Sequence, residues 1–153
     1  MKNNVKRIIS VVLPIVVVAV LGSIFVNIGM DWFNVLDKPT QWIPNWIIPV
    51  VWTIIYLIFV VVLLVWSRKV EIPISTKILL VINGILNILW CLVFFTLKQT
   101  FLGNIVIILN LIAGIALWIN VFVQKRLYSY WITIYPIWLT IATSLNLAIW
   151  ILD

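Results

Sequence analysis

Apolar residues fall in five long runs along the chain, and polar residues are concentrated in the stretches between them. A helix of about 20 residues spans the roughly 30 Å of hydrocarbon in a bilayer, and each run has about that length. The runs are continuous rather than alternating with a period of two, which favours helices over β-strands. The pattern predicts an all-α integral membrane protein, a single domain over residues 1–153 built as a bundle of five transmembrane helices. Their approximate bounds are 8–30, 47–66, 77–97, 101–123 and 130–152.

The composition agrees with a membrane protein. The chain is 65% hydrophobic with a mean hydropathy of +1.26, and 9% of its residues are charged, against about 25% in a typical soluble domain. The first run is long and no A-x-A cleavage pattern follows it, so a transmembrane helix is favoured over a signal peptide. The net charge of +6 does not indicate nucleic-acid binding, because the basic residues stand at the ends of apolar runs. The lipid bilayer is therefore the expected partner.

Lysine and arginine are divided unevenly between the two sides of the predicted bundle. The first and third connections carry only Lys38 and Lys98. Cytoplasmic segments of membrane proteins hold the excess of positive charge. We therefore expect the N-terminus in the cytoplasm, the first connection outside, and the bacterial cytoplasmic membrane as the location. The basic residues on the N-terminal side are Lys2, Lys6, Arg7, Arg68, Lys69, Lys77, Lys125 and Arg126.

Several kinds of chemistry are excluded by the residue types present. The chain has no histidine, one cysteine (Cys91) and four acidic residues, none of them deep in an apolar run. A Cys/His metal site is therefore excluded, and we expect no metal and no required cofactor. Ion-coupled transporters usually carry ionisable groups inside the membrane, and the absence of such groups counts against that class.

Aromatic and asparagine side chains recur at helical spacing on three predicted helices. Asparagine is costly against lipid, so these faces should turn into the bundle. They can be ordinary helix packing with hydrogen-bonding amides, or three faces that converge on a cavity for a planar apolar ligand. Most other tryptophans fit a belt at the membrane interface. The three faces are Trp52, Tyr56 and Phe59; Asn83, Asn87, Trp90 and Phe94; and Tyr135, Trp138, Ala142 and Asn146.

Prolines shape two other regions. Pro39 and Pro44 break the chain before the second helix, while Pro49 sits near its first turn, where a missing N–H is tolerated, so a stiff loop is predicted. This loop either covers the outer mouth of the bundle or lies in the membrane interface. Pro136 is expected to kink the last helix. The loop would carry Trp32, Phe33, Trp42 and Trp46.

Four segments in order resemble motifs of the TspO/MBR family, the tryptophan-rich sensory and translocator proteins. "DWFNVLDKP" resembles W-[YF]-x-x-L-x-K-P, and "PNWIIPVVWTIIY" resembles P-G-W-x-x-P-x-V-W-T-x-L-Y. "NGILNILWCLVFF" resembles N-x-x-x-N-x-x-W-x-x-x-F-F, and "YPIWLTIATSLNLAIW" resembles the terminal Y-x-x-W-x-x-x-A-x-x-L-N-x-x-I-W. The chain departs from the family in its first loop, where Pro44 stands without a second proline and Asn45 replaces a usual glycine.

The resemblance implies a five-helix bundle, often dimeric, with a ligand cavity under the first loop. Family members bind porphyrins such as protoporphyrin IX, some bind sterols or isoquinoline-type drugs, and some bacterial members promote light-dependent porphyrin degradation. The implied function is a membrane receptor or sensor for tetrapyrroles, with protoporphyrin IX or haem as ligand. Alternatives are a porphyrin photo-oxidising enzyme with Trp52 and Trp138 as redox residues, a passive tetrapyrrole or lipid transporter, and a structural subunit without a ligand. The implied ligand-binding residues are Trp32, Phe33, Trp52, Tyr56, Asn83, Asn87, Trp90, Phe94, Trp138 and Ala142.

Overall fold

Helices make up nearly all of the structure. The computed structural model describes residues 2–39 and 43–152. Five spans are long and apolar enough to cross a membrane, with α5 and α6 together forming the fifth. The predicted all-α class and the five spans are therefore confirmed, and the chain is an integral membrane protein. The elements are α1 (Lys2–Val35), α2 (Ile47–Lys69), α3 (Ile74–Cys91), the π-helix η1 (Leu92–Thr96), α4 (Thr100–Gln124), α5 (Arg126–Ile132) and α6 (Ile134–Leu152).

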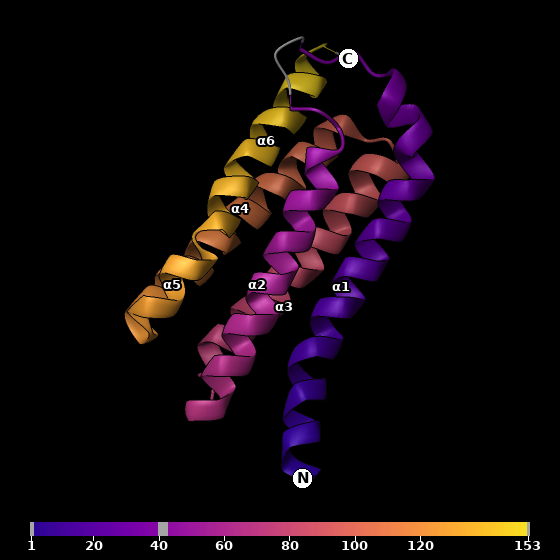
Figure 1. Cartoon of the computed structure of the whole chain (residues 1–153). Helices are drawn as coiled ribbons and strands as arrows, with labels where there is room; N and C mark the ends of the chain where they lie inside the picture. Colours follow the sequence, from indigo (N-terminus) through magenta and orange to yellow (C-terminus); the bar gives the residue numbers. More distant parts are fainter. Residues whose placement is uncertain (1, 40–42, 153) are drawn as a thin grey trace.

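The five spans surround a common interior (Figure 1). Helix α1 contacts α2 on one side and α3 with η1 on the other, α4 packs between α3 and α6, and α5 and α6 contact α2. The connection between α1 and α2 lies at the same end as the C-terminus, which we call the first-loop end (Figure 1). This arrangement lets α2, η1 and α6 bring side chains to one place near the first-loop end.

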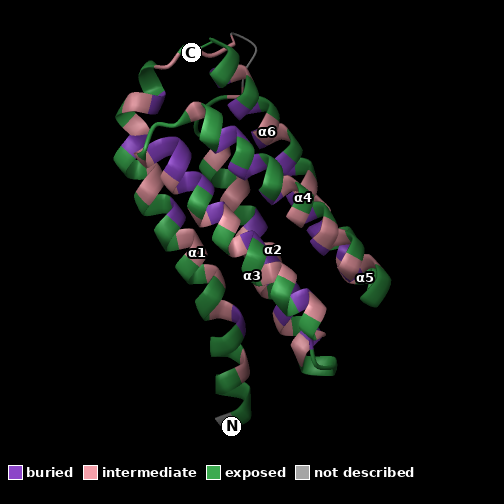
Figure 2. Cartoon of the chain, turned by 180° about the vertical axis from the view of Figure 1, so that it is seen from behind, coloured by how far each residue is buried: buried purple, intermediate pink, exposed green. Residues whose placement is uncertain are grey.

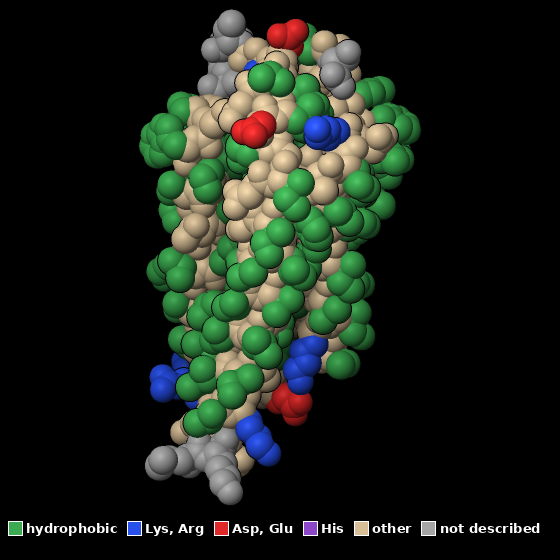
Figure 3. Space-filling view, turned by 90° about the vertical axis from the view of Figure 1, so that its right-hand side faces the viewer, with side chains coloured by type: hydrophobic (Ala, Val, Ile, Leu, Met, Phe, Trp, Pro, Cys, Tyr) green, Lys and Arg blue, Asp and Glu red, His purple; other side chains and the backbone are tan. Residues whose placement is uncertain are grey.

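The outer surface of the bundle is apolar along its length. Valine, leucine and isoleucine side chains on the outward faces of the helices are exposed, while the buried residues lie between helices (Figure 2). On the face shown in Figure 3, charged side chains lie only near the two ends. Lipid chains cover such a surface without loss of hydrogen bonds, because each helix satisfies its own backbone groups.

Helix α1 continues beyond its predicted end. It runs to Val35, so Trp32 and Phe33 lie on its last turns. The prediction that these two residues belong to the first connection is therefore wrong. Polar residues such as Asp31 do not by themselves end a helix. The residue before a proline is disfavoured from helical geometry, and Pro39 follows soon after Val35. Trp46 directly precedes α2, makes no side-chain capping hydrogen bond and is 67% exposed. The predicted loop residue Trp42 lies outside the described residues.

Two of the five spans are interrupted. The third span changes to a π-helix at Leu92, where the Leu97 N–H donates to the Leu92 carbonyl oxygen at 2.9 Å. The fifth span begins earlier than predicted, at Arg126, and breaks at Thr133. Pro136 has no N–H to donate to Ile132, which explains the break and agrees with the predicted kink.

Helix α1 approaches η1 unusually closely at Gly29. A Cβ atom on Gly29 would lie 2.0 Å from the carbonyl oxygen of Phe95. Thr96 Oγ1 also donates to the Phe25 carbonyl oxygen at 2.9 Å, which joins the same two elements. The contact seats the end of α1, with Phe33, against the aromatic residues of η1.

Candidate functional site

An aromatic pocket lies at the first-loop end, between α1, α2, α3, η1 and α6. Each of these elements contributes residues that the sequence had singled out. The pocket is roofed by Ile43 and Asn45 of the first connection and by Ile48 of α2. The predicted site residues that line it are Phe33, Trp52, Trp90, Phe94, Trp138 and Ala142.

The rings of the pocket pack on one another. The centroids of Trp52 and Trp90 are 6.2 Å apart, and Trp90 stacks on Phe94 with its centroid also 6.2 Å away. Phe33 lies against Phe95, with 5.2 Å between the two ring centroids. Aromatic pairs at these separations attract one another beyond their apolar burial. The walls therefore offer flat π-surfaces from α1, from α2 and from the third span, α3 with η1.

Few polar atoms reach the pocket, and one of them, Trp138 Nε1, has no hydrogen-bond partner among the described residues. Trp90 Nε1 donates to Asn146 Oδ1 at 3.1 Å, which fixes the orientation of that indole. Asn45 Nδ2 donates to Asn34 Oδ1 at 3.3 Å at the edge of the roof. Trp138 is 4% exposed, and its Nε1 finds no acceptor within residues 2–39 and 43–152. An unpaired buried donor is costly, so a ligand that accepts from Trp138 would recover that cost.

Four predicted site residues lie around the pocket rather than on its wall. Trp32 packs edge-on against Phe94, and Tyr56 stacks on Trp52 with ring centroids 5.8 Å apart. Asn87 Nδ2 donates to the Tyr56 hydroxyl at 2.9 Å. Asn83 lies deeper still, where it joins three helices. The contact of these four residues with a ligand stays a prediction.

Asn83 and Tyr135 form the centre of a polar contact below the pocket. The Tyr135 hydroxyl lies 3.1 Å from Asn83 Oδ1 and 3.3 Å from Asn110 Oδ1, while Asn83 Nδ2 donates to the carbonyl oxygen of Ala113 at 3.1 Å. These bonds connect α3, α4 and α6. On this face of the third span, Asn83 therefore serves helix packing. Trp90 and Phe94, on the same face, line the pocket.

Some lining residues were not among the predicted site residues. Phe95 faces inward because the π-helix places three consecutive residues, Val93 to Phe95, in the interior, which no α-helical spacing predicts. Asn146 stood on a predicted aromatic face and could have been chosen by that signal. Isolated apolar residues of a loop or helix end carry no such signal. The further lining residues are Ile43, Asn45, Ile48, Phe95, Leu145, Asn146 and Ile149.

The pocket is nearly filled by its own side chains. Its open volume is about 30 Å³, room for about one or two water molecules, whereas ligand pockets usually measure roughly 300–1,000 Å³. A large planar ligand can enter only if rings on the wall move apart. Among the described residues, no group of three His, Cys, Asp or Glu side chains is placed to hold a metal ion. The chemistry available is therefore stacking, hydrogen bonding from indole or amide groups, and electron donation by indole.

Comparison with known proteins points to one family. The family model for the TspO/MBR family matches residues 10–151. The chain is similar to "Tryptophan-rich protein TspO" of Archaeoglobus fulgidus, with 27% identity over 98% of this chain and 99% of that protein. It is also similar to "Protein CrtK" of Rhodobacter capsulatus, with 28% identity over 80% of this chain and 78% of that protein. The chain belongs to the TspO/MBR family.

Proposed function

We propose that the protein is a membrane receptor or sensor that binds a porphyrin-type tetrapyrrole in the aromatic pocket. The observation that carries the proposal is the convergence of Trp52, Trp90 and Trp138, from three helices, on one buried pocket beneath the first connection. A tetrapyrrole is large, flat and apolar over its faces, which suits walls made of rings. Family membership supports the same ligand class.

Binding requires the pocket to open. We propose that helix α1 is the wall that moves, because it contributes a single lining residue to the pocket, whereas α6 contributes five. Its contribution to the pocket is Phe33, which rests on η1. A movement of the α1 end away from η1 would separate Phe33 from Phe94 and Phe95. The energy of stacking and burial by the ligand must exceed the cost of separating these rings.

Porphyrin photo-oxidation is a second candidate function, favoured by the presence of both Trp52 and Trp138 on the pocket wall. A bound porphyrin absorbs visible light, and an indole is the most readily oxidised side chain beside it. One electron would pass from the indole to the excited macrocycle, which leaves an indole radical cation and a porphyrin radical anion. Dissolved dioxygen would then be the oxidant that accepts the electrons lost as the macrocycle is degraded. This route needs neither a histidine nor a carboxylate in the pocket, and the chain has no histidine.

The ligand preference follows from the absence of histidine. Haem iron would find no imidazole ligand, so affinity should depend on the ring more than on the metal. We expect metal-free protoporphyrin IX and haem to bind with dissociation constants within about tenfold, or 1.4 kcal/mol, of each other. Titration of the purified protein in detergent, followed by quenching of tryptophan fluorescence, measures both. A much tighter haem complex with a low-spin spectrum would contradict the expectation, and binding of neither ligand would refute the proposed function.

We also propose that the N-terminus is cytoplasmic, that the first-loop end faces outward, and that the location is a bacterial cytoplasmic membrane. The positive-inside distribution of lysine and arginine supports this orientation. A reporter enzyme fused after Asp153 should then be active only outside the cytoplasm. Activity of that fusion in the cytoplasm would reverse the orientation.

A further inference from the structure

A lysine lies beside the roof of the pocket at the first-loop end. Lys38 follows the end of α1, and its ammonium lies over the ring of Phe33, 4.4 Å from the ring centroid. Phe33 is itself part of the pocket wall. Lys38 therefore places a positive charge one ring away from the pocket interior.

The charge of Lys38 is only partly compensated. Its Nζ donates to the carbonyl oxygens of Phe33 and Leu36, which are among the unpaired carbonyls at the end of α1. Within residues 2–39 and 43–152, the ion pair found is Lys77–Glu71, and Lys38 has no carboxylate partner there. Partial burial removes water from the ammonium and lowers the pKa of Lys38.

The surroundings of Lys38 differ from the rest of the pocket. Asn45 and Asn34 are hydrogen-bonded at the same end, whereas Trp52, Trp138 and Ala142 line the interior. A ligand with an apolar face and one acidic edge would match this division. Its rings would lie among the indoles, and its carboxylates would reach the polar edge.

We propose that Lys38 binds a carboxylate of the tetrapyrrole at the first-loop end, so that the affinity depends on the charge of that carboxylate. The inference rests on the proposed function and adds to it the residue that recognises the acidic edge and the orientation of the ligand. An ammonium already near the wall pairs with a carboxylate through a charge-assisted hydrogen bond. Neutral planar ligands gain nothing from this residue.

The test compares protoporphyrin IX with its dimethyl ester, which has the same ring system and no negative charge. The variants are Lys38→Gln, which keeps N–H donors for the α1 carbonyls, and Lys38→Arg, which keeps the charge. Lys98→Gln is the matched control, because Lys98 is an exposed lysine in the connection between η1 and α4. Comparing the acid-to-ester ratio between variants removes differences in how the two compounds partition into detergent.

We expect the acid-to-ester affinity ratio to fall by about three- to tenfold in Lys38→Gln, and to stay within about twofold of wild type in Lys38→Arg and Lys98→Gln. The affinity for the ester should be unchanged in all of them, which also reports that the variants are folded. A ratio that is unchanged in Lys38→Gln, or that falls equally in Lys98→Gln, overturns the role of Lys38. If the wild type binds neither protoporphyrin IX nor its dimethyl ester, the proposed function itself is refuted.

Discussion

Replacing Gly29 with alanine is expected to push α1 away from η1 and to expose the single cysteine of the chain. The new Cβ would lie 2.0 Å from the Phe95 carbonyl oxygen, and real Cβ atoms essentially never approach closer than 3.0 Å, so the backbones must separate by about 1 Å. Overpacking of this kind costs about 1–3 kcal/mol. Cys91 is buried and lies against Gly22 of α1, so its thiol reports whether α1 is seated.

The measurement is the rate at which a maleimide labels Cys91 in the detergent-solubilised protein. If opening of α1 limits labelling, each 1.4 kcal/mol raises the rate about tenfold, and we expect an increase of roughly ten- to a hundredfold in Gly29→Ala. Gly22→Ala is the matched control on the same helix. There the new Cβ would lie 3.4 Å from Cys91 Sγ, an ordinary contact, so its labelling rate should equal or fall below that of the wild type. Equal rates in all three proteins would contradict the close seating of α1.

Replacing Trp52 or Trp138 with phenylalanine is expected to slow light-driven loss of bound porphyrin far more than it weakens binding. Phenylalanine keeps a flat apolar surface, and stacking on one ring contributes about 0.5–1.5 kcal/mol, so affinity should fall by at most about tenfold. Phenylalanine is much harder to oxidise than indole. If the indoles donate electrons, the decay rate at saturating protoporphyrin IX should fall by at least about tenfold in either variant.

The decay is followed as loss of the Soret absorbance under constant illumination. Trp131→Phe is the control, because Trp131 is 62% exposed on α5, at the opposite end of the bundle from the pocket. Its decay rate should match that of the wild type. If all variants decay at the rate of free porphyrin in detergent, the photo-oxidation hypothesis is wrong and a binding protein remains.

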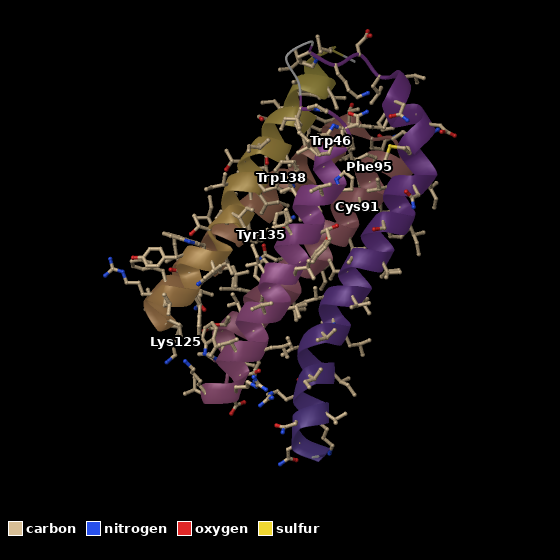
Figure 4. All side chains as sticks on the ribbon, viewed as in Figure 1. Trp46, Cys91, Phe95, Lys125, Tyr135 and Trp138 are labelled. Carbon is tan, nitrogen blue, oxygen red and sulfur yellow. The ribbon has the colours of Figure 1, made fainter. Side chains whose placement is uncertain are left out.

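Much of the fold and part of the pocket could be predicted from the sequence, because apolar length and helical spacing are local properties. Trp52, Trp90 and Trp138 were placed on inward faces by spacing alone, and the pocket contains all three. Figure 4 shows Trp138 above Tyr135 along α6, and Phe95 above Cys91 along the third span. The same spacing also placed Asn83 on an inward face, although its hydrogen bonds to α4 and α6 show a packing role.

Features that depend on contacts between spans could not be predicted. The π-helix that turns Phe95 inward has no spacing signal, and the extension of α1 that carries Phe33 crosses polar residues that suggested a loop. The closed state of the pocket is also a tertiary property. Sequence spacing indicated a cavity, whereas the rings pack on one another and leave about 30 Å³.

The claim that a tetrapyrrole occupies this pocket is tested most directly by filling the pocket. Ala142 is buried on its wall, while Ser144, two residues along α6, is exposed. Protoporphyrin IX is titrated into the wild type, Ala142→Phe and Ser144→Phe, with quenching of tryptophan fluorescence as the signal and a thermal melt to verify folding. We predict saturation at one porphyrin per chain in the wild type, affinity within about twofold of it in Ser144→Phe, and a loss of at least about tenfold in Ala142→Phe. Equal affinity in a folded Ala142→Phe protein would contradict the account, because the porphyrin would then bind elsewhere.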